Sequence, residues 1–285
     1  MAEATDCGRS PLRMILTFLF VVILPLAIGL FAAPRVIQKP RVGLIRLSYD
    51  IFSETAFEVS EQLALARDDA SIRAVVLIIN SPGGSAAYSE ELYLDVLHTR
   101  ERLPVVASID LLAASGAYYI AVAADEIYAD KASLVGSIGV LMDGFGFVGT
   151  MEKLGVERRL LTAGDNKGML DPFSPADPVQ TGYAKAMLDQ IHQQFIDVVK
   201  QGRGARLKET PQTFSGLFWN GEEAVKLGLV DKLGNLDHVA REVVGAPEII
   251  DYTPHDNLAE RFAKRFGAAI GEGAVRALRS IAPIR

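Results

Sequence analysis

Ser115 is the side chain in this sequence best suited to act as a nucleophile. It lies in the segment Ala113–Tyr119 (AASGAYY), which follows an apolar run and opens a helical pattern. At a strand-to-helix junction of this kind, a serine oxygen can face the crevice at the strand ends, with the N–H of Gly116 directed at the same space. A serine in the first turn of a helix commonly serves only as its N-cap, so this segment alone does not define an enzyme.

A second strand-to-helix junction lies one crossover earlier, at Asn80–Ser85 (NSPGGS). Gly83 and Gly84 allow positive φ values there and expose backbone N–H groups beside a helix N-terminus, where negative charge is stabilised. A phosphate-binding loop would end in Gly-Lys-Ser or Gly-Lys-Thr, which this segment lacks. Together the two junctions provide one nucleophile and two sources of backbone donors, which are the parts of an oxyanion hole.

A serine nucleophile needs a base, and the sequence offers histidine or lysine. The chain has four histidines, and the spacing sets none of them beside the serine: His98, His192, His238 and His255. A Ser/His triad stays open as an alternative, because distance along the sequence does not exclude contact in space.

The other candidate base is Lys167, the last residue of the segment Thr162–Lys167 (TAGDNK). A lysine with the ordinary pKa of about 10.4 is almost fully charged at neutral pH, so Lys167 must be desolvated to act as a base. From composition and spacing alone, Lys167 would be expected at the protein surface.

The elements that would position these residues follow a βαβ pattern. Strand-like runs alternate with helical patterns, in the pairs 42–47 with 56–68, 74–80 with 86–100, and 105–109 with a helix from about Ser115. The run at 74–79 is continuously apolar, which indicates a strand buried on both faces. We therefore expect an α/β fold with a mostly parallel sheet covered on both sides.

A second group of elements is predicted further along the chain. Strand-like runs at 126–129, 133–142 and 158–162 surround a short helix near Met151, and a long amphipathic helix runs from Pro178 to about Lys200. Lys167 falls between the last of these strands and the long helix. Its position relative to Ser115 therefore depends on how these elements pack.

An uncharged apolar block at 14–33 precedes the βαβ pattern, and as a helix it is long enough to cross the roughly 30 Å core of a bilayer. We interpret it as one uncleaved transmembrane helix. A cleaved secretory signal is the alternative, because Arg9 and Arg13 precede the block and small residues close it. The block exceeds the roughly 7 to 15 apolar residues of such a signal, and Pro34 follows the candidate cleavage point, so an anchor is favoured. Basic residues flank both ends and do not decide the orientation.

Charge and cysteine content exclude several functional classes. The chain has 29 Lys/Arg and 35 Asp/Glu, of which the first 41 residues hold five and two, so 24 and 33 remain, a balance of −9. A nucleic-acid partner is therefore not expected. The single cysteine, Cys7, precedes the apolar block, so the main domain can hold neither a disulfide nor a thiolate nucleophile. Cys7 itself is either a lipidation site or a plain solvent-facing thiol.

These observations divide the chain into five segments: an N-terminal tail (1–13), a transmembrane anchor (14–33), a linker (34–41), a catalytic domain (42–250) and a C-terminal tail (251–285). The tail has apolar residues at every fourth position with basic residues beside them, which predicts an amphipathic helix: Leu258, Phe262, Phe266 and Ile270. We expect this helix to pack on its own domain or a neighbouring subunit, with the membrane surface as the alternative.

Five segments in order give the chain a family resemblance. They are SPGGS at 81–85, AASGAYYIA at 113–121, VGSIGV at 135–140, TAGDNK at 162–167 and GEEAVKLGLVDKLG at 221–234. Each segment is modestly specific, whereas all five in this order are highly specific. From about Val42 to Val244 the sequence resembles the signal peptide peptidase A (SppA) family of membrane-bound serine proteases, which share the ClpP/crotonase-like fold of repeated ββα and βαβ units.

The resemblance implies roles for individual residues. They are the nucleophile Ser115, the general base Lys167, the lysine-orienting Ser137, and as oxyanion N–H donors Gly116 and the Gly83/Gly84 pair. The sequence does not decide which glycine of the pair donates. Ala117 departs from the family, which commonly has a second glycine there. Its methyl group is expected to be tolerated in a helix and to narrow the nearby pocket. No metal or other cofactor is implied.

The resemblance also implies a function. The chain would be a membrane-anchored endopeptidase with a Ser/Lys dyad that degrades remnant signal peptides and other membrane-associated peptides. It would lie in the inner membrane of a bacterium as a single-pass protein, with the catalytic domain on the periplasmic side and several copies forming a homo-oligomer. The alternatives are a crotonase-like acyl-CoA enzyme and a catalytically inactive scaffold that binds peptides.

Overall fold

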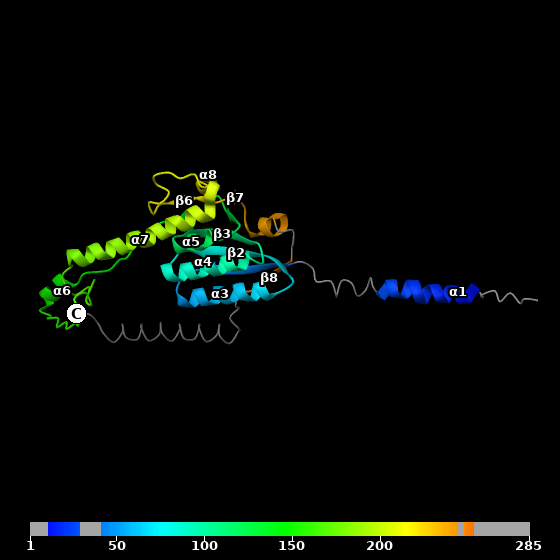
Figure 1. Ribbon diagram of the computed structural model, residues 1–285, viewed down its shortest axis with the longest axis horizontal. Helices are drawn as coiled ribbons and strands as arrows, with labels where there is room; N and C mark the ends of the chain where they lie inside the picture. The colour runs from blue at the N-terminus through cyan, green and yellow to red at the C-terminus, as the bar shows by residue number, and fades with distance from the viewer. Residues whose placement is uncertain (1–10, 29–40, 244–247, 254–285) are drawn as a thin grey trace, which may run out of the picture.

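The computed structural model describes residues 11–28, 41–243 and 248–253 (Figure 1). Its strands are β1 (Arg41–Ser48), β2 (Ile72–Ser81), β3 (Val105–Ala114), β4 (Glu126–Ala129), β5 (Leu134–Gly136), β6 (Phe218–Asn220), β7 (Lys232–Leu233) and β8 (Glu248–Asp251). Its α-helices are α1 (Pro11–Phe18), α3 (Ser53–Asp68), α4 (Ala86–Arg100), α5 (Gly116–Ala121), α6 (Val148–Leu154), α7 (Pro178–Arg203), α8 (Gly221–Lys226) and α9 (Leu236–His238). Short π- and 3₁₀-helical segments are η1 (Leu19–Ile23), η2 (Gly204–Arg206) and η3 (Val239–Val243).

An eight-stranded sheet organises the described part of the chain. The main path runs in the order β6-β5-β3-β2-β1-β8, and β4 pairs with both β3 and β7. All pairs are parallel except that of β5 with β6, which is antiparallel. The predicted α/β fold with a mostly parallel sheet is confirmed.

The central strand β2 is covered on both faces, as its continuous apolar run predicts. Val75, Leu77 and Ile79 belong to an apolar cluster that includes side chains of α3, α4 and α5. Val76 and Ile78 belong to a second cluster with residues of β1, β4 and η3. Successive side chains of a strand point to opposite faces, and all five are at most 7% exposed.

The helices of the first two crossovers lie side by side along the sheet (Figure 1). Helix α4 has the bounds that the sequence predicts, and α3 begins at Ser53, three residues before the predicted start. Because parallel strands run in one direction, β2 and β3 end at the same edge of the sheet. The two glycine-containing junctions that follow these strands therefore meet at that edge.

Residues 139–177 form a long excursion between the core and α7, and we call this segment the arm. Its only regular element is α6. The prediction of a strand at 158–162 was wrong, and the predicted strand at 133–142 is reduced to the three residues of β5. A strand forms only where a neighbouring strand pairs with its backbone, and within the described residues 158–162 has no such neighbour. Figure 1 shows α6 beside the N-terminal end of α7, away from the sheet.

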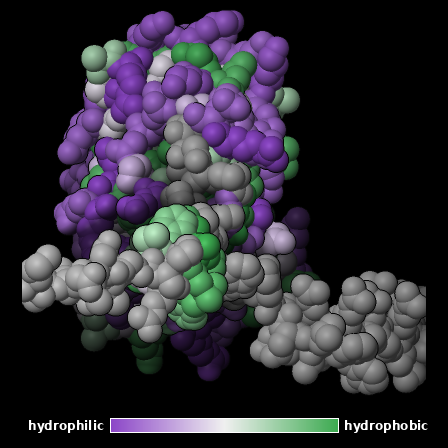
Figure 2. Space-filling model, turned by 90° about the vertical axis from the view of Figure 1, so that its right-hand side faces the viewer, coloured by the Kyte–Doolittle hydropathy of each residue, from purple (hydrophilic) through white to green (hydrophobic). Residues whose placement is uncertain are grey.

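Residues 11–28 are helical, and their large apolar side chains are exposed. In Figure 2, which looks onto the end of the molecule that carries α1, a group of hydrophobic residues stands out from a mostly hydrophilic face. Among residues 11–28, 41–243 and 248–253, no helix has the length and apolar character needed to cross a membrane. The predicted transmembrane helix at 14–33 is thus not confirmed, and its last five residues lie outside the described residues.

Several other predictions also fall outside the part of the chain that the structure describes. Cys7 and most of the linker precede residue 41, and the predicted amphipathic helix of the C-terminal tail lies beyond Thr253. These stay predictions, as do the boundaries of the five segments.

Candidate active site

Ser115 occupies a sharp turn between β3 and α5. Its backbone has φ 54° and ψ −126°, a combination that non-glycine residues rarely adopt. The turn is held on both sides, because the Ser115 N–H donates to Gly136 O at 2.8 Å and the Ser115 carbonyl accepts from Tyr118 N and Tyr119 N. A strained turn that the surroundings hold in place is a common way to present a reactive side chain.

Ser137 lies next to Ser115 at the ends of two paired strands. β3 and β5 are parallel, with Ala114 opposite Gly136, so the two serines are the next residues on adjacent strands. Adjacent strands are about 4.8 Å apart. Ser137 also has a positive φ, 51°, and its N–H donates to Leu217 O at 2.8 Å. The structure therefore brings together the two serines that the family resemblance implies.

The Gly83–Gly84 turn lies directly against the turn of the nucleophile. Gly83 has φ 100°, and a Cβ added there would lie 2.7 Å from Gly116 N and 2.8 Å from Ser115 Cβ. Any side chain at this position would collide with backbone that cannot easily move. Glycine is therefore required both for its conformation and for the close approach of the two turns.

The hydrogen-bond pattern favours Gly84 over Gly83 as the second oxyanion donor. The Gly83 N–H already donates to Ser81 Oγ at 3.2 Å. Gly84 forms a parallel bridge with Ile51 through the flanking atoms Gly83 O and Ser85 N, so its own N–H points to the other side. Within the described residues, neither Gly84 N nor Gly116 N donates a hydrogen bond. Two free donors thus meet near Ser115.

Ala117 is accommodated in helix α5, as the sequence predicts, and a narrowing of the nearby pocket stays a prediction. It is fully buried and belongs to the apolar cluster between the sheet and α4. Its methyl group therefore contributes to core packing. The helix α5 tolerates this residue because alanine is the best helix former.

Lys167 lies on the arm and is exposed. Its backbone N–H donates to Gly164 O at 3.1 Å, and its neighbour Asn166 accepts a hydrogen bond from Gln180 Nε2 at 3.3 Å. In the parts of the chain that the structure describes, the Lys167 side chain donates no hydrogen bond to the hydroxyl of Ser115 or Ser137. The described residues of one chain therefore do not give Lys167 the burial that a lysine base requires, because the arm projects from the core.

Histidine does not take the place of lysine. His192 Nε2 lies 3.1 Å from Ile138 O, His98 Nδ1 faces Arg67 at 3.3 Å, and the His238 ring packs on Tyr128. None of these three described histidines contacts a serine hydroxyl through a hydrogen bond. His255 lies outside the described residues. The Ser/His triad therefore has no support among the described residues.

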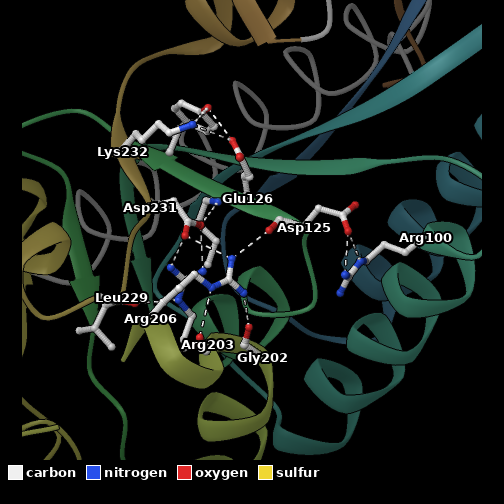
Figure 3. A network of polar contacts seen from close by, with 12 residues as sticks. Arg100, Asp125, Glu126, Gly202, Arg203, Arg206, Leu229, Asp231 and Lys232 are labelled. Carbon is white, nitrogen blue, oxygen red and sulfur yellow. Dashed lines mark hydrogen bonds and ion pairs between the residues drawn. The ribbon is translucent and has the colours of Figure 1, made fainter. Parts of the chain in front are cut away.

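A buried ionic network joins α7 to the helix of the nucleophile (Figure 3). Arg203, at the end of α7, is 1% exposed and donates to both carboxylate oxygens of Asp231, at 3.0 and 2.8 Å. Its Nε also donates to Gly228 O, and the hydroxyl of Tyr118 from α5 donates to Leu229 O, both at 2.8 Å. The segment 228–231 thus holds α7 and α5 in a fixed relation.

Burial and hydrogen bonding shift the pKa values of this network. Burial by itself raises the pKa of Asp231, but the hydrogen bonds from Arg203 and the Ile127 N–H, with the charges of Arg203 and Arg206, outweigh it, so this pKa lies below its ordinary value. Burial raises the pKa of Tyr118 far above its ordinary value. The network therefore stays ionised at Asp231 and neutral at Tyr118 at physiological pH. No sequence pattern indicated a role for Arg203, whereas Asp231 lies within a segment that the family resemblance includes.

The arm has a small organising cluster of its own. Phe147 stacks on Phe173 with ring centroids 5.3 Å apart, and Arg158 lies over Phe173 and pairs with Asp171. A cavity of about 1130 Å³ lies between the arm and the first turns of α7. Ser115 does not line it, so the cavity is separate from the nucleophile.

Comparison with known proteins supports one family over most of this region. The model of peptidase family S49 matches residues 98–246, and the Clp protease model matches residues 37–133. A protein of Methanocaldococcus jannaschii described as a protease is 36% identical over 198 residues, which is 68% of this chain and 63% of that protein. Protease 4 of Haemophilus influenzae is 32% identical over 186 residues, 65% of this chain and 30% of that protein.

A protein of a different description also matches. The Na⁺/H⁺ antiporter NhaA of Brucella abortus is 45% identical over 174 residues, 60% of this chain but 24% of the antiporter. The chain therefore spans less than two thirds of each of these relatives.

Proposed function

Because the chain belongs to peptidase family S49, we propose that it is a serine-type peptidase with Ser115 as its nucleophile. The observation that carries this proposal is the strained Ser115 turn beside Ser137 and beneath the free N–H groups of Gly84 and Gly116. Catalysis of acyl transfer needs a nucleophile and donors directed to one point, and these residues form that half of a site.

The reaction would proceed through an acyl-enzyme. Neutral Lys167 would take the proton of the Ser115 hydroxyl while its oxygen attacks the scissile carbonyl carbon, and the Gly84 and Gly116 N–H groups would stabilise the oxyanion. The lysine would then give its proton to the leaving amine as the C–N bond breaks, and activate water to hydrolyse the ester. Ser137 would accept or donate a hydrogen bond to the lysine and so orient it.

We further propose that the base becomes competent only when a second copy of the chain covers the arm. An exposed lysine is charged at neutral pH and cannot take a proton from serine. Large apolar side chains on the arm are themselves exposed, among them Leu141 and Phe145 at 79% and Leu161 at 96%. A homo-oligomer that buries these side chains would also desolvate Lys167, either beside its own Ser115 or beside that of the neighbour.

The substrates that we propose are remnant signal peptides and other membrane-associated peptides. Support comes from the exposed apolar helix of residues 11–28, which would begin a membrane anchor at 14–33. An anchor would hold the site near lipid-confined substrates and raise their effective concentration. With the resemblance to the SppA family, this suggests a single-pass protein of a bacterial inner membrane whose catalytic domain lies on the periplasmic side.

Peptide cleavage by the full chain, read out as product masses, tests this function. We expect Ser115→Ala and Lys167→Ala each to abolish turnover while the thermal midpoint of unfolding is retained. The controls are Ser215→Ala, an exposed serine whose hydroxyl donates to Gln212 O, and Lys153→Ala, an exposed lysine on the same arm. Turnover by the Ser115→Ala variant at near the original rate would sink the proposal.

Covalent labelling separates the peptidase from the alternative functions. A serine-directed fluorophosphonate should label Ser115 and no other serine. A crotonase-like acyl-CoA enzyme or an inactive peptide-binding scaffold would not need a reactive serine, so absence of labelling together with full biological activity would favour one of these.

A further inference from the structure

One side-chain hydrogen bond ties α7 to the strand end that carries Ser137. His192 Nε2, on the half-buried face of α7, lies 3.1 Å from the carbonyl oxygen of Ile138. A carbonyl oxygen can only accept, so Nε2 must carry the proton. This bond is formed whether the imidazole is neutral in this tautomer or fully protonated.

Each residue of the segment 136–138 forms at least one hydrogen bond that holds it in place. Gly136 O accepts from the Ser115 N–H, the Ser137 N–H donates to Leu217 O, and Ile138 O accepts from His192. Ser137 has a positive φ in the middle of these three contacts. A non-glycine residue keeps such a conformation only where its surroundings over-determine it, so each contact contributes to the orientation of the Ser137 side chain.

Two further contacts of α7 lie on other parts of the core. Phe195 packs on Tyr119 with ring centroids 5.1 Å apart, and Arg203 binds the segment 228–231 (Figure 3). These contacts stabilise α7 on the core, but they touch neither the Ser137 backbone nor the point where the chain enters the arm. His192 contacts the residue directly before that point, because the arm begins at Gly139.

We propose that His192 is a positioning residue, whose hydrogen bond to Ile138 fixes Ser137 and the entry of the arm relative to the nucleophile. This inference rests on the proposed function, in which Ser137 orients the Lys167 base. His192 does not itself touch substrate or exchange protons. Its loss should therefore lower the rate of the chemical step and leave peptide binding largely intact.

Substitution of His192 in the full chain in detergent micelles tests this role. His192→Gln places an amide N–H near the position of Nε2 and should keep at least half of kcat, whereas His192→Leu removes the donor. We expect His192→Leu to lower kcat roughly ten- to hundredfold, the scale on which small misplacements act, with KM unchanged within about twofold. The readouts are kcat and KM on a fluorogenic peptide, and the thermal midpoint of each variant.

Two controls separate positioning from general loss of stability. Val199→Ala truncates a fully buried apolar side chain of the same helix, which forms no hydrogen bond to 136–138, so it should lower the thermal midpoint while kcat is unchanged. His98→Leu removes an exposed histidine on α4 and should alter neither. An equal kcat for Val199→Ala and His192→Leu at matched stability would overturn the inference.

The remaining outcomes are also decisive. A loss of turnover in His192→Gln as complete as in Ser115→Ala would identify His192 as a base and overturn the positioning role. Ser115-dependent turnover that is unchanged in His192→Leu would overturn the inference alone. Turnover of the unaltered chain that does not depend on Ser115 would overturn the proposed function, and the inference with it.

Discussion

Both the core and the arm contain large apolar side chains, but only the core buries most of them. In β2, residues 75–79 are at most 7% exposed and lie between two apolar clusters. In the arm, Leu141, Phe145 and Leu161 are between 79% and 96% exposed, and only a small cluster around Phe173 gives local order. The core carries the candidate nucleophile Ser115 and both candidate oxyanion donors, and the arm carries the candidate base Lys167.

The two halves of the proposed site therefore lie in two regions that differ in burial. The nucleophile half is assembled within one chain, because two parallel strands and two tight turns meet at one edge of the sheet. The base half lies on a segment with exposed apolar side chains, which in our proposal a second copy of the chain covers. A site divided in this way would be active only in the assembled state, which would restrict proteolysis to one place.

The largest expected effect is on glycines, whose substitution should be severe in the core and neutral in the arm. Gly83→Ala adds a methyl group 2.7 Å from Gly116 N at a φ of 100°, so the two turns must separate. We expect peptide cleavage to fall at least a hundredfold, the cost of losing one oxyanion donor. Gly149→Ala, on α6, meets nothing within 4 Å and should leave kcat within about twofold.

Circular dichroism and the thermal midpoint serve as controls in that comparison. They should show that Gly83→Ala is folded, with the loss confined to kcat and fluorophosphonate labelling. Full activity of Gly83→Ala would mean that the Gly83–Gly84 turn does not stabilise an oxyanion.

The next largest effect is on the free energy of unfolding. Breaking an ion pair in the core should lower it far more than breaking one at the arm end of α7. Asp231→Ala leaves the buried guanidinium of Arg203 without its partner, which costs about 3 to 5 kcal/mol. Lys185→Ala removes an exposed pair with Asp189 near the arm, which is worth at most about 0.5 kcal/mol. Urea unfolding of both variants at pH 7 gives the free energies, and equal losses would contradict the difference between the two regions.

The core and the arm also differ in how well their structure could be predicted from the sequence. The bounds of strand β2 and helix α4 were predicted to within two residues, because the apolar residues in each sequence pattern are buried within the core of one chain. The strand predicted at 158–162 was wrong because its apolar residues find no strand to pair with in the described residues. Ser137 could be assigned only by resemblance, since its place beside Ser115 depends on the register of β3 with β5. The contact of His192 with Ile138 joins residues 54 positions apart, and no local pattern signals it.

A smaller effect concerns acid stability. The pKa of Asp231 is lowered in the folded state, so its contribution to the free energy of unfolding is present above the ordinary carboxyl pKa of 3.8 and is lost as the pH falls through the lowered value. Below about pH 4, the free energy of unfolding of the Asp231→Asn variant should fall less steeply with decreasing pH than that of the unaltered chain. Asp171, whose pKa the hydrogen bond from Ser174 lowers, lies in the arm. Its Asn variant should change the global pH profile little, because the side-chain partners of Asp171 all lie in the arm.

The smallest effect is expected from the exposed arm surface, and it should appear only at low protein concentration. Leu161→Ser removes an exposed apolar side chain, so the free energy of unfolding should change by less than about 0.5 kcal/mol. If a second copy covers the arm, activity per chain should fall several-fold at nanomolar concentration and recover as the concentration rises, because the variant dissociates more readily. Leu94→Ser, on the exposed side of α4, is the matched control and should leave this concentration dependence unaltered. Activity per chain that is independent of concentration in both the unaltered chain and Leu161→Ser would mean that Lys167 becomes buried by movement of its own arm, because no partner would then be needed to desolvate it.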